Sequence, residues 1–155
     1  MANSSNDRHS GFNYRPIALL PIISKVLERI IYSRLITLVG PHLSPSQFGF
    51  LPSRSSVQQM LTMLDSIFEA LDRKSCVDCI YLDFKKAFDS VSHNMLLLKL
   101  WNSGVVGVLW DWFQAYLTTR CQCVNVNGSS STFLNVLSGV PQGSVLGPVI
   151  SNLCE

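Results

Sequence analysis

The stretch VDCIYLDF, residues 77–84, is short, apolar and partly β-branched or aromatic, and the sequence KKAFD, residues 85–89, follows it at once. This composition predicts a buried β-strand over residues 77–84. Asp83 would lie at the end of that strand, where a carboxylate is costly unless it is paired or bound to a metal ion. The residues AFDSVSH then indicate a turn, which would leave a pocket above the strand end.

Two amphipathic helices are predicted before this strand, over about residues 20–39 and 56–73. Gly40-Pro41 would end the first helix, and Ser55 or Ser56 can cap the second. We expect both apolar stripes to pack in the core. They comprise Ile23, Val26, Leu27, Ile30, Ile31, Leu35 and Leu38 in the first helix, and Val57, Met60, Leu61, Leu64, Ile67, Phe68 and Leu71 in the second.

Helices and a hairpin are predicted after the strand. Helices are expected over residues 92–104 and about 106–119, the second with Leu109, Trp112, Phe113 and Tyr116 facing inward. Valine alternates with asparagine before Asn127-Gly128, which predicts a β-hairpin that returns over residues 132–137. A further helix is expected after the PQGS sequence, residues 141–144. The predicted fold class is therefore α+β.

The composition indicates one domain with an unusually apolar character. The chain has 155 residues, of which 47% are hydrophobic and 14% charged, and its mean hydropathy is +0.25. We therefore expect some of its apolar surface to meet other protein. No apolar run approaches the roughly 20 residues needed to span a membrane. Residues 1–13 are polar, lack an apolar signal sequence and are expected to be disordered, so we expect an intracellular protein.

The five cysteines suggest reduced thiols, because their number is odd and no signal peptide is present. Cys76 and Cys79 have the spacing of a zinc motif, but on a strand these two positions point to opposite faces. The others are Cys121, Cys123 and Cys154. We expect buried, unreactive thiols.

The net charge of +2 is too small to indicate nucleic-acid binding by itself. Residues 1–54 carry six basic and two acidic side chains, whereas residues 55–155 carry six basic and eight acidic ones. The basic first third could face phosphates. On charge alone, a solvated helix face explains it equally well.

Four sequence blocks in order resemble the reverse transcriptases of non-LTR (LINE-type) retrotransposons. LDFKKAFDSVSH, residues 82–93, resembles motif A of that family, and SGVPQGSVLGPVI, residues 138–150, resembles motif B. YRPIALLPIISKVLERIIYSRL, residues 14–35, and LSPSQFGFLPSRSS, residues 43–56, are similar to the segments that open the domain. A single block would be weak support, whereas four in the family's order are specific.

The resemblance implies RNA-templated DNA synthesis with two Mg²⁺ ions. In such enzymes one ion activates the primer hydroxyl and the other holds the triphosphate. Asp83 would bind both ions, and the backbone carbonyl of Phe84 would help to hold one of them. The implied partners are an RNA template, a DNA primer and dNTPs.

The same resemblance assigns dNTP-binding roles to four further residues. Phe88 would lie beneath the sugar and exclude a 2′-hydroxyl, although its spacing alone favours a core aromatic. Gln142 and Gly143 would form the nucleotide pocket, and Arg15 would grip the triphosphate through its planar guanidinium.

Arg54 would contact the template or stabilise the fingers loop. Where family members usually have an arginine two residues after the corresponding glycine, this chain has Leu51. One basic side chain of the family pattern is therefore missing from this loop.

The implied architecture is a right-hand polymerase with an incomplete palm. The fingers would comprise residues 14–75 and about 92–138, and the palm residues 76–91 and 139–155. The family continues into an Asp-Asp hairpin that carries the second metal-binding carboxylate, and the sequence ends before it. We therefore expect residues 1–155 alone not to extend a primer.

Two alternatives stay open. One is an RNA-dependent RNA polymerase. Phe88 argues against it, because that family usually has an acidic residue five positions after the first aspartate. A domesticated, non-catalytic fragment would instead bind RNA or a protein partner.

Overall fold

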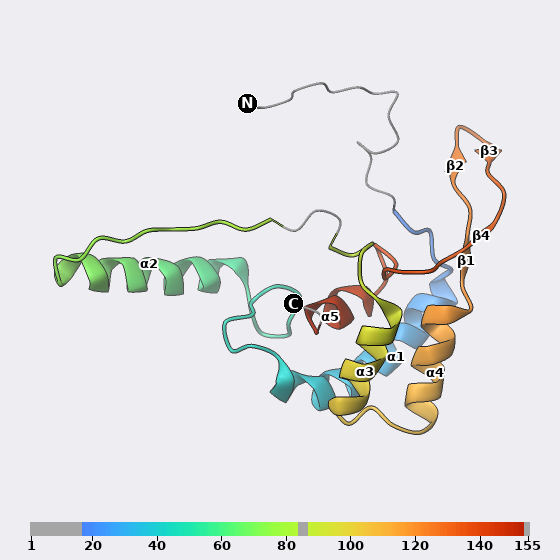
Figure 1. The fold of residues 1–155 in the computed structure, drawn as a ribbon, viewed down its shortest axis with the longest axis horizontal. Helices are drawn as coiled ribbons and strands as arrows, with labels where there is room; N and C mark the ends of the chain where they lie inside the picture. Colours follow the sequence, from blue (N-terminus) through green and yellow to red (C-terminus); the bar gives the residue numbers. More distant parts are fainter. Residues whose placement is uncertain (1–16, 84–86, 154–155) are drawn as a thin grey trace.

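A computed structural model describes residues 17–83 and 87–153, and Figure 1 shows the arrangement of the elements. The helices are α1 (Ile22–Val39), α2 (Ser56–Asp72), α3 (His93–Asn102), α4 (Val108–Thr118) and α5 (Gly147–Asn152), with a short 3₁₀ turn η2 (Gly40–His42) after α1. The strands are β1 (Cys121–Gln122), β2 (Asn125–Val126), β3 (Ser129–Ser130) and β4 (Leu134–Asn135). The mixture of helices and a small amount of sheet agrees with the α+β prediction.

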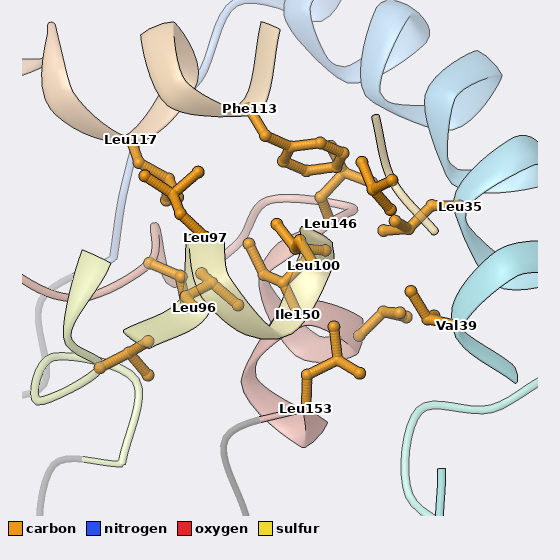
Figure 2. Packing of buried hydrophobic residues seen from close by; sticks show 14 residues of the cluster. Leu35, Val39, Leu96, Leu97, Leu100, Phe113, Leu117, Leu146, Ile150 and Leu153 are labelled. Atoms are coloured by element: carbon orange, nitrogen blue, oxygen red, sulfur yellow. The ribbon is translucent and has the colours of Figure 1, made fainter. Parts of the chain in front are cut away.

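The core lies among α1, α3, α4 and α5. Figure 2 shows Leu35 of α1, Leu100 of α3 and Phe113 of α4 pointing toward one another around the leucines and isoleucine of the last segment. The side chains of Leu35, Leu100 and Phe113 are fully buried. The buried cluster comprises Leu35, Val39, Val91, Leu96, Leu97, Leu100, Val105, Phe113, Leu117, Val140, Leu146, Val149, Ile150 and Leu153.

Helix α1 has the predicted bounds but buries a different set of side chains. Its buried residues are Glu28, Leu35 and Val39, whereas Ile23 and Ile30 of the predicted stripe are exposed. These three residues are spaced by seven and four positions, so only a narrow face of α1 packs against the core. Of the predicted stripe, Leu35 is buried and Ile31 packs against the core, so the prediction was right for these two residues and wrong for the exposed ones. The reason is that α1 has apolar residues on more than one face.

Helix α2 begins where the sequence predicts. The Ser55 side chain accepts a hydrogen bond from the backbone N–H of Gln58, whose side chain accepts one from the Ser55 N–H, forming a capping box. The predicted burial of its apolar stripe is wrong, because α2 has no buried residue and extends away from the other helices (Figure 1). Its length and cap are local properties, whereas burial requires a partner that the described residues do not provide.

The predicted buried strand at residues 77–84 is also not borne out. The described residues 76–83 are extended and exposed and form no strand, while Phe84 lies outside the described parts. Ile80, Tyr81 and Leu82 are 84%, 81% and 81% exposed. A strand forms only when a neighbour pairs with its backbone N–H and C=O groups, and no described segment does so here.

The predicted hairpin is confirmed. Strand β2 pairs antiparallel with β3, and β1 pairs with β4 farther from the turn. Asn127 and Gly128 connect β2 to β3 with φ angles of 50° and 83°, which suit the tight hairpin turn that Asn-Gly favours. All four short strands are exposed, and the hairpin extends beyond α4 (Figure 1).

The cysteine prediction fails for the four cysteines that the structure describes. Cys76, Cys79, Cys121 and Cys123 are free and exposed rather than buried, because their segments lie outside the helical core. Cys154 and the N-terminal residues 1–13 are outside the described ranges. Among the described residues, no helix is long and apolar enough to cross a membrane.

Candidate functional site

Residues 87–91 lie beside residues 138–140, which directly precede the PQGS sequence. The Val140 N–H donates to the Phe88 carbonyl at 2.8 Å, and the Gly139 N–H donates to the Val91 carbonyl at 2.8 Å. The Ser138 hydroxyl adds a hydrogen bond to the Asp89 carbonyl at 3.0 Å. Residues 87–91 and 138–140, far apart in sequence, are therefore joined along their backbones.

Gly139 permits this close approach. Its φ angle is +82°, and a Cβ atom there would lie 2.8 Å from the Phe88 carbonyl oxygen and 2.8 Å from Asp89 backbone atoms. Only glycine combines this backbone conformation with the space available. Its carbonyl also accepts hydrogen bonds from His93 Nε2 at 2.9 Å and Arg120 Nη2 at 3.3 Å. Because a carbonyl only accepts, His93 Nε2 carries the proton.

Phe88 lies at the junction of the two segments. Its side chain is half-buried and packs against the core cluster. Its ring centroid is 6.3 Å from that of Phe50 in an edge-to-face arrangement. The carbonyl of the neighbouring Gly49 accepts a hydrogen bond from Asn152 Nδ2 at 3.0 Å, so the Phe50 turn is also connected to α5.

The predicted pocket residues Gln142 and Gly143 lie on a defined turn after this junction. Gln142 is half-buried, and Gly143 is exposed with φ +101°. The Gln142 carbonyl accepts from the Ala18 N–H at 2.9 Å. Ser144 Oγ donates to the Pro141 carbonyl at 2.8 Å and accepts from the Gly147 N–H at 2.8 Å, which closes the turn onto α5.

Asp83 ends the exposed extended segment before the junction, so its carboxylate is not at the end of a buried strand. Arg15 and Phe84, which the sequence also predicts to contact ligands, lie outside the described residues. Across residues 17–83 and 87–153 there is no cluster of three or more histidine, cysteine, aspartate or glutamate side chains that could hold a metal ion. Asp83 is a suitable oxygen ligand for Mg²⁺, but it supplies only one carboxylate.

Arg54 makes contacts within its own loop. Its guanidinium lies 5.0 Å from the centroid of the Phe48 ring, and its Nη1 donates to the Pro45 carbonyl. A cavity of about 440 Å³ adjoins it, lined by Phe48, Ser53, Arg54, Gln58, Leu61 and Thr62. Both predicted roles of Arg54, contact with the template and stabilisation of the fingers loop, stay predictions.

Glu28 is a site residue that the sequence reasoning missed. Its side chain is only 2% exposed, and its Oε2 accepts from the N–H groups of Val145 at 2.7 Å and Leu146 at 3.3 Å. Its Oε1 accepts from the Tyr116 hydroxyl at 3.2 Å. The seven-residue spacing from Glu28 to Leu35 places both on one helix face, which is the sequence feature that could have identified it.

Glu28 also shapes the electrostatics of its neighbours. Burial raises the pKa of Tyr116 to about 12, and the adjacent Glu28 carboxylate raises it as well. Burial lowers the pKa of Arg120, whose guanidinium lies 5.2 Å from the centroid of the Tyr116 ring. Tyr116 therefore keeps its proton throughout the physiological pH range and donates a hydrogen bond to Glu28.

The family model for reverse transcriptase (RNA-dependent DNA polymerase) matches residues 8–154. The chain belongs to this family. It is 39% identical over 140 residues to a probable RNA-directed DNA polymerase from transposon X-element of Drosophila melanogaster, a match that covers 89% of this chain. It is 34% identical over 143 residues, 91% of this chain, to the RNA-directed DNA polymerase from mobile element jockey of Drosophila funebris.

These relatives come from non-LTR retrotransposons, in agreement with the resemblance seen in the sequence blocks. A further similarity, 26% over 147 residues, is to the Pol polyprotein from type-1 retrotransposable element R2 of Popillia japonica. That match covers 94% of this chain. It spans only 15%, 16% and 20% of the X-element, jockey and R2 proteins, so it corresponds to a small part of each.

Proposed function

We propose that this chain forms part of the active site of an RNA-directed DNA polymerase, which uses an RNA template, a DNA primer and dNTPs. Residues 14–75 and about 92–138 belong to the fingers, and residues 76–91 and 139–155 to the palm. Membership of the reverse transcriptase family supports the nucleic-acid partners. The extended residues 76–83 become the palm strand only where further protein pairs with them.

One observation carries this proposal. The backbone hydrogen bonds between residues 87–91 and 138–140 bring Phe88 close to the turn that holds Gln142 and Gly143. A dNTP site needs a surface for the sugar and a surface for the base within one nucleotide's length. Phe88 supplies the sugar-facing ring, and Gln142 with Gly143 supplies the base-side pocket.

Asp83 and the Phe84 carbonyl are the metal ligands that this chain contributes, and Arg15 binds the triphosphate. Bound Mg²⁺ would activate the primer hydroxyl and neutralise charge on the phosphates. Asp83 supplies only one carboxylate, so the other ligands of the Mg²⁺ ions would come from residues that the structure does not describe. Arg54 holds the fingers loop through Phe48 and Pro45.

A chimeric polymerase tests the proposal, with residues 14–150 replacing the matching segment of the X-element protein. Asp83→Asn keeps the shape of the side chain and removes its charge, so primer extension on RNA should fall by at least about a thousandfold, since a metal ligand is lost. RNA binding should stay within about twofold, because phosphate contacts elsewhere dominate it.

Asp78→Asn is the matched control, because Asp78 is exposed on the same extended segment. It should leave primer extension unchanged. An Asp83→Asn chimera that retains a tenth of the activity would remove Asp83 from the site. A chimera that binds RNA but never extends a primer, while the unmodified X-element enzyme does, would favour the non-catalytic RNA-binding alternative.

A further inference from the structure

Glu28 is a buried charge outside the set of residues with an expected role in the reaction. Taking a carboxylate out of water is expensive unless hydrogen bonds compensate for the cost. Three hydrogen bonds compensate for the cost here, from Val145, Leu146 and Tyr116. Two of these donors are consecutive backbone N–H groups that directly follow the PQGS turn.

The segment around α1 contacts the same turn at a second point. The Ala18 N–H, four residues before α1, donates to the Gln142 carbonyl at 2.9 Å. A Cβ on Gly143 would lie 3.4 Å from the Ala18 carbonyl oxygen, so the two backbones are in contact. Ala18 therefore contacts the turn at Gln142 and Gly143. Glu28 binds Val145 and Leu146, the two residues that directly follow the turn.

Glu28 also connects the turn to α4. The Tyr116 hydroxyl donates to the carboxylate oxygen that does not bind the backbone, so each oxygen has its own partner. Tyr116 in turn lies beneath the guanidinium of Arg120, which donates to the Gly139 carbonyl. The turn and the junction before it are thus connected to α1 and α4 through polar side chains.

We propose that Glu28 is a positioning residue for nucleotide binding, which fixes the Gln142–Gly143 turn at the distance from Phe88 that a dNTP requires. This inference rests on the proposed dNTP-binding role of that turn. Glu28 itself touches no substrate. It acts through the backbone of Val145 and Leu146, whose position sets that of the turn before them.

Glu28→Met in the chimeric polymerase tests the proposal, because methionine keeps the volume and removes both carboxylate oxygens, which together accept three hydrogen bonds. Amide hydrogen exchange at Val145 and Leu146 should accelerate at least tenfold, and the KM for dNTP should rise at least tenfold. The kcat should change less than threefold, whereas the melting temperature should fall, because the donors of Val145, Leu146 and Tyr116 lose their acceptor. Glu28→Gln, which retains one acceptor oxygen, should give intermediate exchange and KM values.

Val39→Ala is the control for a purely structural effect, since Val39 is buried on the same helix but has no side-chain hydrogen-bonding group. It should lower the melting temperature and leave the KM for dNTP unchanged. Unchanged exchange at Val145 and Leu146 in Glu28→Met would overturn the proposal, as would faster exchange with an unchanged KM.

The exchange measurement does not depend on catalysis and can be repeated on the 155-residue chain. An inactive chimera, or an active Asp83→Asn variant, would count against the proposed function. The exchange rates would still decide whether Glu28 holds the turn.

Discussion

Phe88 is the residue at which nucleotide selection and core packing make different predictions. Its half-buried ring contacts both the core and the Phe50 ring, so its position is compatible with either role. In the chimeric polymerase, Phe88→Val should raise ribonucleotide use relative to deoxynucleotide use by at least about tenfold, or roughly 1.4 kcal/mol of discrimination. The measurement is the ratio of kcat/KM for the two nucleotides.

A purely structural Phe88 would behave differently. Truncation of a core aromatic lowers stability by roughly 3–5 kcal/mol when the ring is fully buried, and it would reduce the use of both nucleotides together. An unchanged kcat/KM ratio would therefore exclude the selective role. Phe113→Val, at the fully buried aromatic of α4, is the control for general loss of packing.

Tyr116 predicts a dependence of stability on alkaline pH. Its pKa is about 12 in the folded protein, against an ordinary value of 10.0. Between these pH values the folded state holds a proton that the unfolded state has lost. The contribution of Tyr116 to the free energy of unfolding is therefore fully present below pH 10 and is lost as the pH rises toward 12. The loss should be on the order of 2–3 kcal/mol.

Tyr116→Phe isolates this contribution. The variant should be less stable than the unchanged protein at pH 8, and the difference in free energy of unfolding should shrink as pH rises from 10 to 12. Chemical denaturation at several pH values measures it. Parallel pH profiles for the two proteins would show that Tyr116 does not titrate as described.

Whole elements could be predicted where their determinants are local. The capping residues of α2 and the Asn127-Gly128 turn act over a few residues, and both elements formed as expected. The strand at residues 77–84 could not be predicted from its own composition, because a strand depends on pairing with residues far away in sequence. The same reason explains why the stripe of α2 stays exposed.

The candidate site shows the same division. The sequence blocks selected Phe88, Gln142 and Gly143, and the structure places their segments together. From the sequence we assigned no role to Glu28 or Gly139, because both act through contacts between distant parts of the chain. The spacing from Glu28 to Leu35 indicates only that these two residues share a helix face. Tertiary hydrogen bonds of this kind have no local sequence pattern.

Gly139 makes the junction between residues 87–91 and 138–140 testable. Gly139→Ala should lower the free energy of unfolding more than Gly104→Ala does, by roughly 1–3 kcal/mol, because its Cβ would overlap backbone atoms. Gly104 is the matched control: its φ of +86° imposes the same strain on alanine, but nothing lies within 4 Å of the added atom. Equal losses from the two substitutions would mean that the segments separate easily.

At the scale of the whole molecule, a small core carries a large exposed apolar surface. Four helices share the buried cluster, while α2 and residues 77–82 present most of their apolar side chains to solvent. This distribution agrees with the high mean hydropathy of +0.25. Surfaces of this kind in soluble proteins usually mark contacts with other protein.

The isolated 155-residue chain should therefore bind a hydrophobic dye strongly and melt over a broad temperature range. Leu61→Gln combined with Phe68→Gln should at least halve the dye fluorescence, because both side chains are 61% exposed on α2. The free energy of unfolding should change by no more than about 1 kcal/mol, as expected for two surface substitutions. Leu100→Ala, in the core, should instead increase dye binding and lower stability by about 2–5 kcal/mol. A sharp melting transition without dye binding, or a large loss of stability in the α2 double variant, would mean that this helix face is covered within the chain itself.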